Sequence, residues 1–146
     1  MQHRDKIILD KIIDEVNIAT KMLSDIKQDD FVSDDILKRA AAMSVINIGE
    51  LVKNLTPEFR NEYKNVPWKA ISGFRDVAAH KYGTLDMNIV YNTVKIDIPM
   101  LKENIQQILK TADVKITELS ALRREGACQR SGQPDLGERH ARSRGG

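Results

Sequence analysis

An arginine, a histidine and a tyrosine lie within eight positions of one another, at Arg75, His80 and Tyr82. Arginine carries a permanent charge and a planar fork of donors that suits phosphate oxygens, whereas histidine titrates near neutrality and can move a proton. Such a group can do phosphate chemistry. Each member also has a structural role open to it. A histidine at a helix end can favour the negative end of the helix dipole, Arg75 can pair with Asp76 or Asp86, and Tyr82 can close the bundle with its ring.

The spacing on a helix argues against a site within one chain. Five residues of a regular α-helix turn the side-chain direction through about 500°, so Arg75 and His80 would point some 140° apart. They could share one phosphate if the helix distorts near its end, or if a twofold axis sets two copies of the helix against each other. Ala78 and Ala79 would permit such a close approach.

Four principal helices are expected to position these residues. Apolar side chains recur at every third or fourth residue, which is typical of one face of an α-helix. We therefore expect helices over residues 4–27, 33–55, 68–82 and 86–112 and a short helical connector over 57–63. The polar stretch Gln28-Asp29-Asp30 should separate the first two.

Individual residues indicate boundaries and buried faces. The cap residues are expected to be Ser33 with Asp34, then Thr56 before Pro57, and Asp86. Gly49 should mark a place where another backbone comes close, Gly83 suits the left-handed position after a helix, and Pro99 should kink the last helix. The core side of the second helix is expected to include Ile36, Ala40, Met43, Ile46 or Asn47, and Leu51.

Composition supports an all-α fold, an antiparallel bundle of four to five helices. Aromatic residues make up 5% of the 146 residues, while helix-favouring aliphatic and charged residues recur throughout. The single cysteine, Cys128, rules out a disulfide framework within one chain. No secretory signal segment and no apolar run long enough to span a bilayer is found, so we expect a cytoplasmic protein with no membrane partner.

The net charge of +2 conceals two different segments. Residues 1–120 carry 17 basic and 18 acidic side chains, whereas residues 121–146 carry 6 and 3. A nearly neutral body disfavours a broad phosphate-binding surface, so any contact with RNA must be local. We expect a helical domain over 1–115 and an Arg/Gly-rich tail over 116–146 that is disordered, differs from the body in coding origin and has no assigned function.

The segment Gly73–Tyr82 resembles the signature of HepT-like toxins, a branch of the HEPN superfamily of small helical ribonucleases. In that signature an arginine, four residues, a histidine, one residue and a tyrosine follow one another. Further blocks resemble the family's pattern in order and spacing, so that the likeness covers roughly residues 5–112. These blocks are Ile48-Gly49-Glu50, Val66-Pro67-Trp68, Leu85-Asp86 and Asp97-Ile98-Pro99-Met100-Leu101.

The resemblance implies a metal-independent endoribonuclease with no cofactor, active as a homodimer with a composite site. Arg75 and His80 map to the catalytic pair, and Asp76 to the supporting polar position. Tyr82 maps to the tyrosine to which a nucleotidyltransferase antitoxin of the MntA kind attaches AMP, which silences the toxin. The implied reaction is attack by the RNA 2′-hydroxyl on the adjacent phosphorus. In agreement, residues 1–120 contain only His3 and His80 as histidines and no metal-ligand cluster.

Two alternatives remain at this stage. The chain could be a non-catalytic helical subunit that binds a nucleotide or its partner enzyme, or a purely structural bundle. Glu50 could orient the site but is interpreted as a solvated helix charge. Trp68 is interpreted as a bundle anchor rather than a base-stacking platform, and Lys81 as an exposed lysine.

Overall fold

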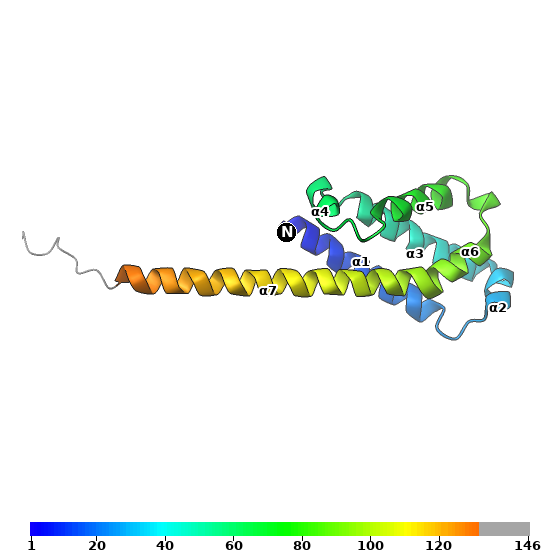
Figure 1. The fold of residues 1–146 in the computed structure, drawn as a ribbon. Coiled ribbons are helices and arrows are strands. Elements are labelled where there is room, and N and C mark those ends of the chain that lie inside the picture. Colours follow the sequence, from blue (N-terminus) through cyan, green and yellow to red (C-terminus); the bar gives the residue numbers. More distant parts are fainter. Residues whose placement is uncertain (132–146) are drawn as a thin grey trace, which may run out of the picture. The chain divides into compact units, whose positions relative to one another are not determined.

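Seven α-helices make up the part of the chain that the structure describes, and no strand occurs there. This computed structural model describes residues 1–131, apart from the side chains of Ile116 and of residues 124–131. The predicted all-α bundle is confirmed. The helices are α1 (His3–Met22), α2 (Gln28–Ser33), α3 (Asp35–Lys53), α4 (Pro57–Glu62), α5 (Trp68–His80), α6 (Met87–Asn92) and α7 (Ile98–Ser131), with a 3-10 turn η1 (Tyr82–Thr84) and a π-turn η2 (Thr93–Asp97) (Figure 1).

The compact unit is Met1–Leu109, and every residue discussed below as part of a site lies within it. In this unit α3 packs against both α1 and α5, as Figure 1 shows. The described residues from Lys110 onward belong to a second unit, which begins inside α7. None of the helices in the described part is both long enough and apolar enough to cross a membrane. The core includes the fully buried side chains Leu9, Ile12, Val16, Phe31, Val52, Leu55, Val66, Val90 and Ile105.

The caps expected from the sequence hold several of these helices in place. The Asp34 carboxylate accepts hydrogen bonds from the backbone N–H groups of Ile36 and Leu37, so the cap of α3 is Asp34 rather than Ser33. The Thr56 hydroxyl accepts from the N–H of Phe59 at the start of α4. The Asp86 carboxylate likewise caps α6. Each cap satisfies N–H groups that the first helical turn leaves without a partner.

The first helix is shorter than its pattern indicated. It ends at Met22 instead of Lys27, and residues 28–33, which we interpreted partly as a break, form α2. Phe31 of α2 is fully buried, and its ring lies 5.5 Å from that of Tyr91. This short helix is therefore fixed by a contact 60 residues away along the chain, which local periodicity does not reveal.

The predicted buried face of α3 was wrong in two of its residues. Ile36 is 83% exposed and Met43 is 55% exposed. Because α3 packs on α1 and α5 at once, its buried face is set by both neighbours rather than by its most apolar stripe. The residues that α3 buries are Ala41, Ala42, Ser44, Val45, Ile48, Gly49 and Val52.

Two expectations for the second half of the chain need revision, and a third, the kink at Pro99, stays a prediction. Gly83 does not adopt the left-handed conformation, since no glycine in the described residues has a positive φ. Pro99 lies two residues after the π-turn η2, a local change of helix geometry next to the residue that lacks a backbone donor. The last helix does not end near Ala112 but continues to Ser131, so residues 116–131 of the predicted tail are helical. Residues 132–146 of that tail lie outside the described residues.

Candidate active site

Helix α5 carries Arg75, Asp76 and His80 and places His80 on a different side from Arg75. It is a regular α-helix from Trp68 to His80, so the rotation of about 140° between Arg75 and His80 applies. Arg75 faces α3 and its side chain is 22% exposed. His80 is the last residue of the helix and is exposed. Among the described residues, no contact joins these two side chains within one chain.

A glycine in α3 allows Arg75 to lie so close to that helix. A Cβ atom added to Gly49 would lie 2.2 Å from the Cβ of Arg75 and 3.2 Å from the carbonyl oxygen of Ile71. Only a residue without a side chain permits this approach. The prediction that Gly49 marks a close backbone contact is confirmed, and the contact is made with the helix that carries the candidate site.

Four charged side chains meet where α3 and α5 touch, and we call Glu50, Lys53, Arg75 and Asp76 the charge cluster. Arg75 Nε lies 3.1 Å from Glu50 Oε2, close enough for an ion pair though not aligned for a hydrogen bond. Arg75 Nη1 donates to Asp76 Oδ1 at 3.1 Å, and the ammonium of Lys53 donates to the same oxygen. The guanidinium is therefore held from two sides.

Two members of the charge cluster were misjudged from the sequence. Glu50 was interpreted as a solvated helix charge, but it is half exposed and paired with Arg75. Lys53 was not singled out at all. The available signal was that Glu50 and Lys53 stand three residues apart beside Gly49, so that they share the helix face that approaches α5.

The cations of the charge cluster keep Asp76 ionised. The hydrogen bond from Lys53, followed by that from Arg75, lowers the pKa of the Asp76 carboxyl below its usual value of 3.8. Asp76 is thus a carboxylate at neutral pH and a hydrogen-bond acceptor for Arg75. It is not suited to donate a proton in a neutral solution.

A second group of polar residues lies at the C-terminal end of α5. The ring of His80 has no hydrogen bond or ion pair with any residue in the described part of the chain, so both nitrogens are available. Tyr82, in the turn η1, is half-buried. The guanidinium carbon of Arg39, on α3, lies 5.8 Å from the centre of the Tyr82 ring. Arg39 was not noticed in the sequence, since it belongs to no recognisable motif.

The remaining predicted positions have structural roles. Trp68 is 5% exposed, its indole N–H donates to the Tyr63 carbonyl at 3.0 Å, and its ring packs on Phe59. The interpretation of Trp68 as a bundle anchor is confirmed. Ala78 is 1% exposed within the single chain, so it cannot contact a second copy of the helix, whereas Ala79 is exposed. Lys81 is exposed, as expected.

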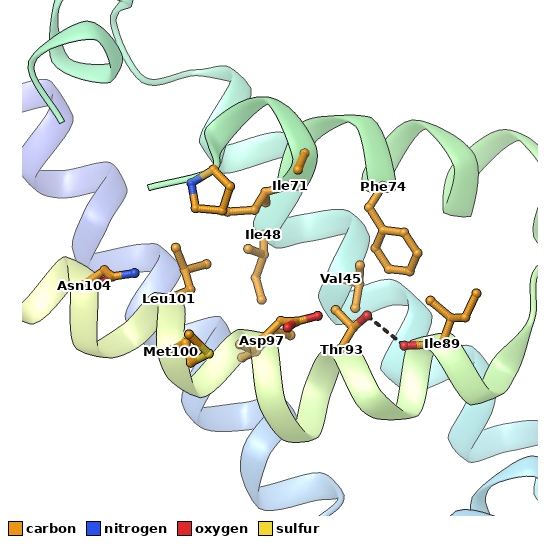
Figure 2. Close-up of a pocket in the computed structure, with 13 residues that line it drawn as sticks. Val45, Ile48, Ile71, Phe74, Ile89, Thr93, Asp97, Met100, Leu101 and Asn104 are labelled. Carbon is orange, nitrogen blue, oxygen red and sulfur yellow. Dashed lines mark hydrogen bonds between the residues drawn. The ribbon is translucent and has the colours of Figure 1, made fainter. Parts of the chain in front are cut away.

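A separate groove of about 470 Å³ runs between α5 and the segment from α6 to the start of α7 (Figure 2). Its walls are mainly apolar, and the Asp97 carboxylate on one wall would repel phosphate. Neither Arg75 nor His80 lines it, and it is therefore not the candidate RNA site. Within the described residues, no three His, Cys, Asp or Glu side chains gather as metal ligands would. The groove is lined by Val45, Ile48, Pro67, Ala70, Ile71, Phe74, Ile89, Thr93, Asp97, Ile98, Met100, Leu101 and Asn104.

Comparisons with known proteins agree on one family. The family model described as Ribonuclease HepT-like matches residues 12–108. A protein of Caldanaerobacter subterraneus, named as a candidate RNase, is 38% identical over 102 residues, which are 70% of this chain and 91% of that protein. A protein of Thermococcus cleftensis, named probable ribonuclease HepT, is 28% identical over 75% of this chain and its own full length.

A larger relative shares only part of its length with this chain. A protein of Methanocaldococcus jannaschii, named as a gamma-glutamylcyclotransferase and candidate RNase, is 36% identical over 108 residues. The match covers 74% of this chain but 49% of that protein, so the chain spans about half of its length. No solved structure matches the chain.

Proposed function

Because the chain belongs to the HepT-like ribonuclease family, we propose that it is a metal-independent endoribonuclease, the toxin of a type II toxin–antitoxin system acting on cytoplasmic RNA. The names of its relatives as candidate or probable RNases support the nuclease activity. The observation that carries the proposal is the arrangement along α5, where an arginine is fixed in place by two carboxylates. Five residues later follows an exposed histidine that has no partner among the described residues.

The proposed reaction needs one proton acceptor, one proton donor and one stabiliser of charge. The RNA 2′-oxygen attacks the adjacent phosphorus, and the bond from phosphorus to the 5′-oxygen of the next nucleotide breaks. His80 takes the proton of the 2′-hydroxyl, and the resulting imidazolium or a water molecule returns a proton to the leaving 5′-oxygen. Arg75 binds the phosphoryl oxygens while negative charge grows on them. The products are a 2′,3′-cyclic phosphate and a 5′-hydroxyl.

The charge cluster suits the role proposed for Arg75. The contacts of Arg75 with Glu50 and Asp76 engage its Nε and Nη1 atoms. Neither contact uses Nη2, whose two N–H groups can donate to a phosphate. A guanidinium that is already oriented loses less conformational entropy when substrate binds. Asp76 is thus a positioning residue, as the resemblance implies.

Two copies of the chain are needed to bring the proposed catalytic pair together. The α5 face that carries His80 also carries Gly73 and the 44% exposed Val77. If a twofold axis passes near Val77, residues at equal distances before and after it oppose each other, so His80 of one copy lies opposite Phe74 of the other, at the level of Arg75 along the helix. The Arg75 side chain starts on the face of α5 turned toward α3, so its guanidinium would have to reach around α5 toward that His80. We therefore propose a homodimer with two composite sites.

Silencing is proposed to occur at Tyr82, through a nucleotidyltransferase of the MntA kind. The Tyr82 hydroxyl oxygen attacks the α-phosphorus of ATP, the new O–P bond forms, and the bond to the departing pyrophosphate breaks. The phenolic proton passes to a base of the transferase or to water. Tyr82 stands two residues after His80, so the attached nucleotide would add negative charge and bulk beside the RNA site.

The experiment that tests the proposed function is cleavage of labelled RNA by the purified full chain in excess chelator. We expect cutting to continue and to leave 2′,3′-cyclic phosphate ends. His80→Ala should reduce the rate by about a hundredfold or more, the usual contribution of a general acid or base. Cleavage that stops on addition of chelator, or that leaves 5′-phosphate ends, would contradict the mechanism.

A second candidate function is a non-catalytic subunit that binds a partner enzyme or nucleotide. The observation in its favour is that Arg75 already has two carboxylate partners, as a structural arginine would. The same assay separates the two functions, because a binding subunit would leave RNA intact at every enzyme concentration. Co-purification with a nucleotidyltransferase is expected for both.

A further inference from the structure

Arg39 and Tyr82 form a contact that the proposed cleavage reaction does not use. Arg39 lies in α3, ten residues before Gly49, which places it about 15 Å along the helix from the charge cluster. Its guanidinium carbon lies 5.8 Å from the centre of the Tyr82 ring. Arg39 therefore lies near the C-terminal end of α5, which ends at His80, and not near Arg75.

The guanidinium of Arg39 has donors to spare. One nitrogen, Nη1, donates to the carbonyl oxygen of Asp35 at 3.0 Å, which ties the side chain to its own helix. The Asp35 carboxylate itself is 3.0 Å from the ammonium of Lys38. Asp35 is thus ion-paired with Lys38 and attracts Arg39 only more weakly, while the Arg39 guanidinium lies over the Tyr82 ring.

An arginine over an aromatic ring is poised to bind an anion attached to that ring. A phosphate bonded to the Tyr82 hydroxyl oxygen would extend from the ring, within the range of a rotation of the Arg39 side chain. Guanidinium binds phosphate oxygens through charge-assisted, bidentate hydrogen bonds, which are stronger than its attraction to a ring. Arg39 would then exchange a weak contact for a strong one.

We propose that Arg39 binds the phosphodiester that Tyr82 carries after adenylylation and so holds the nucleotide beside His80. The inference rests on the proposed function, since it requires that Tyr82 accept AMP from ATP. Bound in this way, the nucleotide stays at the end of α5, where it excludes RNA. Without Arg39 the AMP group would move with the exposed turn and exclude RNA only part of the time.

The test compares the parent chain with Arg39→Ala, Arg39→Lys and the control Lys38→Ala, which removes a neighbouring cation that already has a partner. Each full-length chain is adenylylated with a purified nucleotidyltransferase and labelled ATP. Two quantities are then measured: the rate at which a soluble phosphodiesterase releases AMP, and the remaining RNA cleavage relative to the same chain before modification. The first readout does not depend on nuclease activity.

In Arg39→Ala we expect AMP release to be about tenfold faster or more, the effect of losing a charge-assisted hydrogen bond, together with a clear rise in remaining cleavage. Arg39→Lys should fall between the parent and Arg39→Ala, and Lys38→Ala should match the parent. Equal rates of release in Arg39→Ala and the parent would overturn the inference. Uptake of label by Tyr82→Phe equal to that of the parent would overturn it together with the proposed silencing. Absence of RNA cleavage by the unmodified parent would overturn only the nuclease, because AMP release still reports on Arg39.

Discussion

Neighbouring charges orient Arg75 before the proposed reaction begins. One of them, Asp76, determines how this arrangement depends on pH. Asp76 forms no bond with the RNA in that reaction, but its carboxylate accepts a hydrogen bond from Arg75 and another from Lys53. The pKa of the Asp76 carboxyl is lowered, so this contact is complete above the usual value of 3.8 and is lost only as the pH falls through the lowered value. His80, by contrast, has no partner within the described residues.

This environment gives a prediction for the pH profile of cleavage. Asp76→Asn should lower the maximal rate, because an uncharged amide holds the guanidinium less firmly. It should leave the pH of half-maximal rate on the acid side unchanged, since Asp76 is ionised throughout that range in the parent. The measurement is kcat against pH for the two proteins. An acid limb that moves in Asp76→Asn would show that Asp76 itself takes part in proton transfer.

The position of Arg75 depends on the contact between helices α3 and α5. Gly49 allows it, and Glu50 and Lys53, one and four residues later, add the charges that hold the α5 side chains. From the sequence, the close approach at Gly49 and the caps at Thr56 and Asp86 could be predicted, because each follows from local stereochemistry. The buried face of α3 and the short helix α2 could not, because contacts distant in sequence decide them.

Two glycine substitutions distinguish the steric effect of the close approach at Gly49 from the effect of helix propensity on stability. Gly49→Ala should destabilise the protein by about 1–3 kcal/mol, because its new Cβ would overlap the Arg75 Cβ and force α5 away. It should also reduce cleavage by moving Arg75. The matched control is Gly73→Ala in α5, where an added Cβ meets no atom within 4 Å. There we expect a gain of about 0.5–1 kcal/mol from helix propensity.

Urea unfolding of the two variants gives both free energies, and cleavage rates are measured on the same samples. A Gly49→Ala protein as stable and as active as the parent would mean that α5 can shift without cost, contrary to the tight contact seen in the structure. Because Gly73 lies on the α5 face proposed for the homodimer, a destabilised Gly73→Ala would indicate that the second copy covers that position.

At the scale of the whole molecule, the candidate site is incomplete in one chain. The sequence predicted the reason, because a spacing of five residues on a regular helix separates Arg75 and His80 by rotation, and α5 is regular over both. The sequence also suggested that Ala78 would face a second copy. The structure instead buries Ala78 and leaves Gly73, Val77 and Ala79 exposed on α5. Which side of a helix faces outward depends on how the whole bundle packs.

The most direct test of the composite site mixes two inactive variants. Arg75→Ala and His80→Ala should each be inactive as homodimers, whereas co-expression of both chains should produce heterodimers in which one of the two sites has Arg75 from one copy and His80 from the other. With random pairing, about a quarter of the parent's cleavage activity should return. If the mixture stays as inactive as either variant alone, although mass spectrometry of the intact complex shows that heterodimers have formed, then the two residues do not act across the subunits and the proposed site is wrong.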